Sequence, residues 1–271
     1  MPLVRDARAL YARAYDERFA LPAFNVCNLE MTQGVLEAAE AERAPVILQT
    51  YPGDVAHGDP GLVPMLRALG DESDVPVILH LDHGQGLQMV VDRLRRGYSS
   101  VMFDGAELDL EENITRTRLI AEIAHAFGAS VEGEVGLFGG DHGSVVFTDP
   151  GEAEYFMTES GADTLAVSVG SEHHQESRLD LPHLEAIAER TNRPLVLHGG
   201  SGIHPSDVRE AVLLGVVKIN IGHAISLALT GAAGEALEAK LDHYEMLKVM
   251  RDSVRAVARE KLQLMKATTR A

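Results

Sequence analysis

The stretch at residues 77–84, Val-Ile-Leu-His-Leu-Asp-His-Gly, ends in two side chains that could do chemistry. Its first half is the apolar, β-rich run of a strand that is buried on both faces. Asp82 and His83 then stand where this strand becomes a loop. A carboxylate beside an imidazole at such a place could be a general base next to a metal ligand. The alternative is that the pair only caps the strand.

Two further predicted strands end in histidine. Residues 194–202 read Pro-Leu-Val-Leu-His-Gly-Gly-Ser-Gly, with His198 at the strand end, and another strand leads to His173 and His174. Three histidine ligands with an open fourth position are typical of a catalytic zinc site. We therefore predict a metal centre formed by His83, His173 and His198. His174 is the alternative to His173 as a ligand.

Strand and helix patterns alternate along the whole chain, and this alternation must position the histidines. The predicted strands cover residues 21–27, 45–51, 77–84, 99–104, 130–134, 163–169, 194–198 and 216–221. Strands that alternate with helices favour a parallel sheet. Eight such units in 271 residues predict an α/β fold, a single (β/α)8 TIM barrel over residues 1–271, with an open doubly wound sheet as the alternative. A helical segment at 224–266, interrupted at 231–234, extends the barrel.

Polar side chains stand at nearly every predicted strand end, where a barrel carries its active site. They are Asn25, Tyr51, Asp82, His83, Asp104, Glu134, His173, His198 and Asn220. Stability alone does not require polar groups at one end of the strands, so we predict a convergent site. The glycine-rich segment at 136–147 follows the fifth strand and is interpreted either as a lid or as a solvated loop.

Glycine-bearing turns follow the last two predicted strands. The first is Gly199-Gly200-Ser201-Gly202 and the second is Asn220-Ile221-Gly222-His223. Backbone amides in the loops after strands seven and eight of a barrel commonly bind phosphate. The two turns together predict a phosphate site.

Composition narrows the classes of partner. The net charge of −17 argues against nucleic acid or an anionic membrane as the main partner. No apolar run approaches the roughly 20 residues of a membrane span. The single cysteine, Cys27, excludes an internal disulfide and fits a reducing compartment, so we expect a cytoplasmic protein. Cys27 itself is interpreted as a small core residue of the first strand.

Several ordered motifs resemble one enzyme family. Leu-His-Leu-Asp-His-Gly, Leu-His-Gly-Gly-Ser-Gly and Val-Lys-Ile-Asn-Ile resemble the class II, zinc-dependent ketose-bisphosphate aldolases that act on fructose and tagatose bisphosphates. The similarity begins at Pro22-Ala-Phe-Asn-Val and extends to about Ala224, through Ser100-Val-Met-Phe-Asp-Gly and Val131-Glu-Gly-Glu-Val-Gly. These motifs are highly specific for the superfamily and less specific for the substrate.

The resemblance implies a metal-dependent lyase of carbohydrate metabolism, such as glycolysis, that cleaves or forms a C–C bond of a phosphorylated ketose. One Zn²⁺ per chain would be held by His83, His173 and His198 and would stabilise an enediolate of dihydroxyacetone phosphate. Asp82 would transfer the proton of the C4 hydroxyl. Asp104 and Glu134 match positions that support the ligands or form a second metal site, and a monovalent cation is a further candidate. The substrate-binding residues implied are Asn25, His174, Gly199, Gly200, Ser201, Asn220, Ile221, Gly222 and His223.

Some residues near the expected substrate differ from the family pattern. Tyr51, His174 and His223 each replace a small residue near the substrate, so the pocket is expected to be reshaped. Two alternatives therefore stand beside the leading one: an aldolase for a different keto-sugar or keto-acid phosphate, and a non-catalytic companion subunit. The apolar residues of the helical tail, together with the resemblance, predict a homodimer or homotetramer. The alternative is that the tail only closes the barrel.

Overall fold

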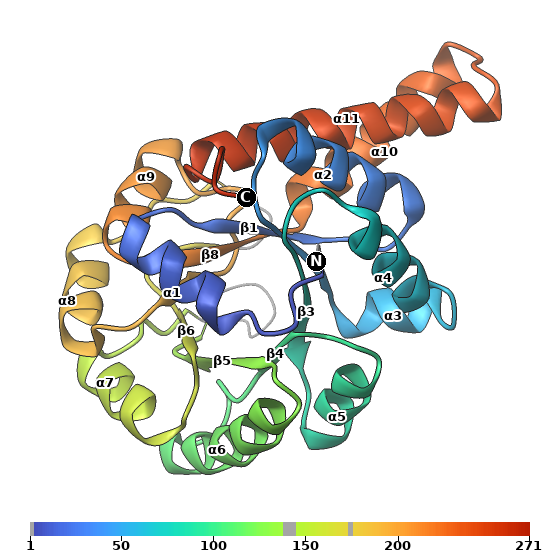
Figure 1. Ribbon diagram of the computed structural model, residues 1–271. Coiled ribbons are helices and arrows are strands. Elements are labelled where there is room, and N and C mark those ends of the chain that lie inside the picture. Colours follow the sequence, from blue (N-terminus) through green and yellow to red (C-terminus); the bar gives the residue numbers. More distant parts are fainter. Residues whose placement is uncertain (1–2, 138–144, 173–175) are drawn as a thin grey trace.

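The computed structural model describes residues 3–137, 145–172 and 176–271. Within these residues, eight parallel strands pair in sequence order and close into a barrel, with β1 hydrogen-bonded to β8 (Figure 1). The strands are β1 (Leu21–Asn25), β2 (Val46–Thr50), β3 (Val77–Gly84), β4 (Ser100–Phe103), β5 (Ser130–Val135), β6 (Thr164–Val167), β7 (Leu195–Leu197) and β8 (Val216–Ile221). The predicted (β/α)8 barrel is confirmed.

The helices surround the barrel on its outside (Figure 1). They are α1 (Arg8–Glu17), α2 (Leu29–Glu42), α3 (Pro52–Gly58), α4 (Leu62–Glu72), α5 (Leu87–Arg95), α6 (Leu110–Ala126), α7 (Pro150–Glu159), α8 (Leu181–Thr191), α9 (Pro205–Leu213), α10 (His223–Glu238) and α11 (His243–Leu264). The exception is α1, which lies across one end of the barrel and packs Leu10 and Tyr11 on Leu21 and Ile78. None of the helices in the described ranges has the length and apolar character of a bilayer span.

Alternation along the strands separates the outer core from the barrel interior. On β3, Val77, Leu79 and Leu81 belong to the apolar layer shared with the helices. Ile78 belongs instead to the cluster under α1. His80 and Asp82 share the strand face of Ile78. Both are buried and take part in polar networks. The interior therefore changes from apolar at the α1 end to polar toward the carboxyl ends of the strands.

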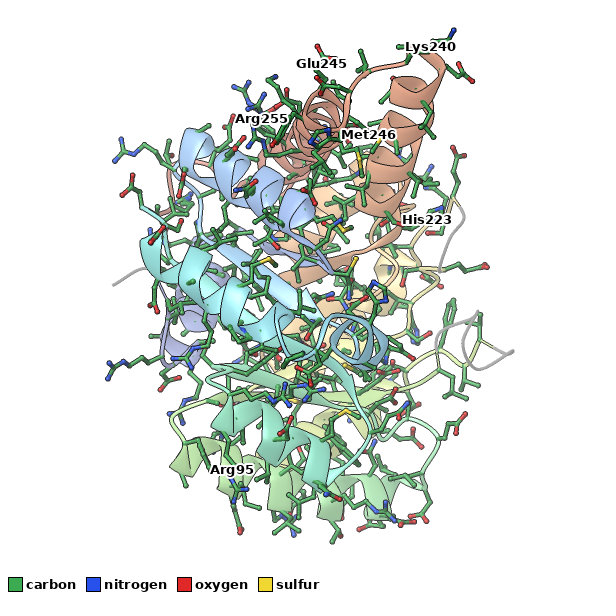
Figure 2. The ribbon with its side chains drawn as sticks, turned by 90° about the vertical axis from the view of Figure 1, so that its right-hand side faces the viewer. Arg95, His223, Lys240, Glu245, Met246 and Arg255 are labelled. Carbon is green, nitrogen blue, oxygen red and sulfur yellow. The ribbon has the colours of Figure 1, made fainter. Side chains whose placement is uncertain are left out.

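Helices α10 and α11 form an antiparallel hairpin that projects beyond the barrel (Figures 1 and 2). In Figure 2, Lys240 lies at the tip of the hairpin and His223 at its base. The inner part of α11 packs along α2, with Val254 fully buried. Near the tip, Leu237 and Tyr244 are 70% and 74% exposed.

One helix was not predicted, and one local expectation was wrong. Helix α3 was not predicted, because its Pro-Gly start favours a turn; Asp54 stabilises it by accepting a hydrogen bond from the backbone N–H of Tyr51. The predicted interruption of the helical tail at 231–234 is absent from α10, which continues through Gly231 and Gly234. The break falls instead between α10 and α11, where Lys240 has a left-handed φ of 54°.

Candidate active site

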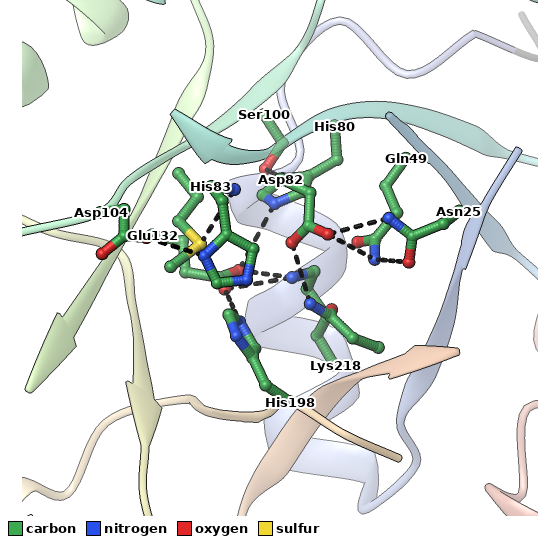
Figure 3. A network of polar contacts seen from close by, with 12 residues as sticks. Asn25, Gln49, His80, Asp82, His83, Ser100, Asp104, Glu132, His198 and Lys218 are labelled. Carbon is green, nitrogen blue, oxygen red and sulfur yellow. Dashed lines mark hydrogen bonds and ion pairs between the residues drawn. The ribbon is translucent and has the colours of Figure 1, made fainter. Parts of the chain in front are cut away.

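The end of β3 brings two neighbouring side chains to the same place. Regular alternation would point Asp82 and His83 to opposite faces of the sheet. The register shifts between Leu81 and Gly84, and His83 has a left-handed φ of 49°. As a result, Asp82 and His83 have ligand atoms within one cluster at the barrel mouth (Figure 3). A non-glycine residue in this conformation stores strain that the surrounding structure must hold.

The carboxylate of Asp82 is held by amide side chains from β1, β2 and β8 (Figure 3). It accepts hydrogen bonds from Asn25 Nδ2 at 2.8 Å, Asn220 Nδ2 at 2.9 Å and, more weakly, Gln49 Nε2 at 3.4 Å. Burial alone would raise the pKa of Asp82. Nearby positive charges, of which that of His83 has the largest effect, outweigh burial and lower this pKa. The carboxylate is therefore fixed in position and ionised at neutral pH.

Histidine side chains from β3 and from the end of β7 meet beside this carboxylate. One ligand atom each of Asp82, His83 and His198 lies within 4.8 Å of the others. The rings of His83 and His198 are 4.9 Å apart between centroids, at an angle of 71°. Two histidines at this spacing fit a divalent transition metal, and Asp82 would lie beside it.

The carboxylates around His83 also favour a bound cation. Burial alone would lower the pKa of His83, but the carboxylates of Asp82, Asp104 and Glu134 raise it to about 10. His83, Asp104 and Glu134 form a second cluster whose ligand atoms lie within 4.8 Å of one another. Among the described residues, the buried oxygens of Glu134 have no hydrogen-bond partner. Its pKa is raised, first by burial and then by the charge of Asp104. A bound cation would satisfy these carboxylate oxygens.

A buried network of charged side chains holds His198 in place. Nε2 of His198 lies 3.0 Å from Glu132 Oε1, and Lys218 Nζ lies 2.8 Å from Glu132 Oε2 (Figure 3). His80 lies 3.7 Å from the same carboxylate and 2.7 Å from the hydroxyl of Ser100. Because a carboxylate accepts only, Nε2 of His198 donates to Glu132. An orienting carboxylate behind a histidine ligand is a common feature of metal sites.

The cavity above these groups has a volume of about 340 Å³. It is lined by Asn25, Cys27, Met31, Tyr51, Asp54, Asp82, His83, Gly199, Ser201, Asn220, Gly222, His223 and Ser226. Both glycine turns thus contribute to its wall, and Ser201 Oγ accepts a hydrogen bond from the backbone N–H of Ala224, which joins the two turns. Pockets of this volume suit a small ligand.

Most of the predicted site residues come together. His198, Asp104 and Glu134 lie beside the cavity floor near His83, whereas Gly200 and Ile221 are buried behind the turns. His173, His174 and residues 138–144 of the predicted lid lie outside the described residues. Cys27 is not a core residue of the first strand. It follows the end of β1, is half-buried and faces the cavity.

The sequence reasoning missed the groups that support the site. Glu132 and Lys218 were not singled out, although each lies in a buried strand two residues before a predicted site residue. Positions two apart on a strand point to the same face, so Glu132 shares its face with Glu134 and Lys218 with Asn220. That two-residue spacing could have identified Glu132 and Lys218 as site residues. Asp54 and Ser226 belong to helices, and nothing in their local sequence marked them.

Comparison with known proteins matches this geometry to one family. Residues 5–270 match the family described as "Fructose-bisphosphate aldolase class-II". The chain belongs to the class II fructose-bisphosphate aldolase family. This confirms the predicted family and class of enzyme, an aldolase, which is a lyase.

Relatives in this family have different named substrates. The chain is 35% identical to the fructose-bisphosphate aldolase of Thermus caldophilus, covering 100% of this chain and 98% of the relative. It is 35% identical to the D-tagatose-1,6-bisphosphate aldolase subunit GatY of Klebsiella oxytoca, covering 88% of each. The crystal structure of the YdjI aldolase from Escherichia coli K12 superposes with a TM-score of 0.91 at 32% identity, covering 99% of both chains. Family membership therefore leaves the choice of ketose open.

Proposed function

We propose that this aldolase cleaves and forms a C–C bond of a phosphorylated ketose, with dihydroxyacetone phosphate as one product of cleavage. The observation that carries the proposal is the convergence of Asp82, His83 and His198 at the floor of a cavity lined by two glycine turns. The floor would hold the reacting carbonyl and hydroxyl groups. The turns would hold the phosphate through backbone N–H groups, as glycine-bearing loops after the last strands of a barrel often do.

We propose that one Zn²⁺ per chain is bound by His83, His198 and His173, with His174 as the alternative third ligand. Because Nε2 of His198 donates to Glu132 and Nδ1 of His83 lies 2.9 Å from Asp104, the other ring nitrogens would bind the metal. A bound zinc would supply a Lewis acid that stabilises negative charge on the ketose oxygen. Asp104 and Glu134 would support it or offer a second position, and a monovalent cation as a further cofactor stays a prediction.

The proton transfer is assigned to Asp82. In cleavage its carboxylate would take the proton of the C4 hydroxyl, and in condensation it would return that proton. The lowered pKa keeps Asp82 ionised, and Asn25 and Asn220 hold both of its oxygens in place. A group that is held in this way loses little orientation freedom when the substrate binds.

Metal analysis of the His198→Ala variant tests this proposal. We expect tightly bound zinc to fall from about one per chain to near zero, because one of three histidine ligands is removed. The matched control is His243→Ala on the exposed N-terminal turn of α11, which should keep its zinc. Full zinc retention in His198→Ala would remove this residue from the metal site.

We propose that the chain forms a homodimer or homotetramer through the α10–α11 hairpin. Leu227, Leu237 and Tyr244 are 56%, 70% and 74% exposed on this projecting element. A projecting hairpin with large exposed apolar side chains gains stability when a second copy covers it. The Leu237→Glu variant should shift the mass measured by light scattering toward the monomer. A monomeric mass of the unaltered protein at micromolar concentration would contradict the assembly.

A further inference from the structure

The two sides of the active-site cavity differ in the groups that they offer to a ligand. One side is formed by the glycine turns after β7 and β8, which present backbone amides. The other side is formed by the β1–α2 and β2–α3 segments and by the first turns of α10. Its lining side chains are Cys27, Met31, Tyr51, Asp54 and Ser226. The first side suits a phosphate, and the described residues of the second include no lysine or arginine to bind one.

The described wall of the cavity lacks the two permanently charged side chains that ordinarily bind phosphate. Among the residues that the structure describes, no lysine or arginine side chain lines this cavity. The segments 138–144 and 173–175 contain neither residue type in their sequence. Recognition of a phosphate by side chains ordinarily uses arginine or lysine in charge-assisted hydrogen bonds. The net charge of −17 adds no favourable background field.

Asp54 makes the side opposite the glycine turns, called the far side below, unfavourable for a second phosphate. Its Oδ2 accepts a hydrogen bond of 2.8 Å from the backbone N–H of Tyr51, which fixes the carboxyl group at the start of α3. An ionised carboxylate repels a phosphate, and a protonated one still brings no positive charge. The same group is a good acceptor for the hydroxyl groups of a sugar. This side of the cavity therefore suits a hydroxylated, uncharged chain.

We propose that the ketose substrate carries a phosphate only at the end held by the glycine turns, and that its other end is an uncharged hydroxyaldehyde portion. This inference rests on the proposed aldolase function. In cleavage the C3–C4 bond breaks, the C4 hydroxyl passes its proton to Asp82, and C4 becomes the carbonyl carbon of a free hydroxyaldehyde. The electron pair of the broken bond stays with the three-carbon phosphate, which takes up a proton from water at carbon and leaves as dihydroxyacetone phosphate, while Asp82 releases its proton to water.

The test is aldol condensation by the zinc-loaded protein, with dihydroxyacetone phosphate fixed and the aldehyde varied. Glyceraldehyde and glyceraldehyde 3-phosphate differ only in the phosphate under test. We expect kcat/KM to be at least about tenfold higher for glyceraldehyde, because the phosphate would lose hydrogen bonds to water beside Asp54 without gaining a charge-assisted hydrogen bond. A preference for glyceraldehyde 3-phosphate would overturn this inference and leave the proposed function intact. Failure to condense any aldehyde would overturn the proposed function as well.

A gain of activity provides an independent test. Ser226 is exposed on α10 and faces the cavity, so it can accept a long side chain. Ser226→Arg should raise kcat/KM for glyceraldehyde 3-phosphate by about tenfold, because it supplies the missing cation. The control Ser226→Gln adds similar length without charge, so the gain is measured as the ratio of Ser226→Arg to Ser226→Gln. Equal behaviour of the two variants would show that a far phosphate does not reach this side, and the inference would be wrong.

Discussion

Replacing Lys218 by methionine should destabilise the barrel, because it leaves a buried carboxylate without its counter-charge. The side chains of Lys218 and Glu132 are 0% and 1% exposed, and Nζ lies 2.8 and 3.1 Å from the two carboxylate oxygens. Removal of one partner from such a pair typically costs about 3–5 kcal/mol. His198 lies 3.0 Å from the same carboxylate and can offset part of the charge. We therefore expect a loss of about 3 kcal/mol, at the lower end of this range.

Urea unfolding of the metal-free protein, followed by far-ultraviolet circular dichroism, measures this loss. The double variant Lys218→Met with Glu132→Gln removes both charges and should recover about 2 kcal/mol relative to the single variant, since contacting residues couple. Lys248→Met is the matched control, because this lysine is 64% exposed and its pair with Asp252 lies on the surface. The control should cost less than about 1 kcal/mol. A Lys218→Met variant as stable as this control would refute the reasoning.

Two further predictions concern stability. Burial raises the pKa of Asp207, but hydrogen bonds led by that of Arg178 outweigh it and lower the pKa below 3.8. The advantage of the unaltered protein over Asp207→Asn should therefore be constant above this value and shrink as the pH falls below it, as measured by unfolding across the acid range. Gly200→Ala should lower the thermal midpoint, because an added Cβ would lie 2.2 Å from Ile219 Cγ2. Gly231→Ala in α10, where an added Cβ meets nothing within 4 Å, should raise it.

The barrel could be predicted because its strands carry strong local signals. The run at 77–84 is apolar at its start and polar at its end, and similar runs recur at regular spacing along the chain. Helix α3 was missed because a proline and a glycine at its start resemble a turn, and its cap by Asp54 is visible only in three dimensions. The hairpin break at Lys240 was misplaced because glycine lowers helix propensity without preventing a helix that packs against a neighbour.

The site was predictable where it depends on strand ends and less so where it depends on long-range contacts. Asp82, His83 and His198 follow from their positions, since the carboxyl ends of barrel strands share one face. The irregular end of β3, which lets both Asp82 and His83 reach one cluster, could not be predicted from their positions. The role of Glu132 was also hidden, because its partners His198 and Lys218 are 66 and 86 residues away in the sequence.

In the proposed mechanism, Asp82 moves a proton at a metal site without being needed to hold the metal. Aldol condensation of dihydroxyacetone phosphate with glyceraldehyde, measured together with zinc content, separates these two roles in the unaltered protein and in Asp82→Ala. We expect a chelator to stop the unaltered protein, and Asp82→Ala to keep its zinc while losing about 10²- to 10⁴-fold in rate. A loss of less than a few-fold would make Asp82 a structural cap of the strand, and loss of zinc would make it a ligand. Either result would show that Asp82 is not the proton-transfer group.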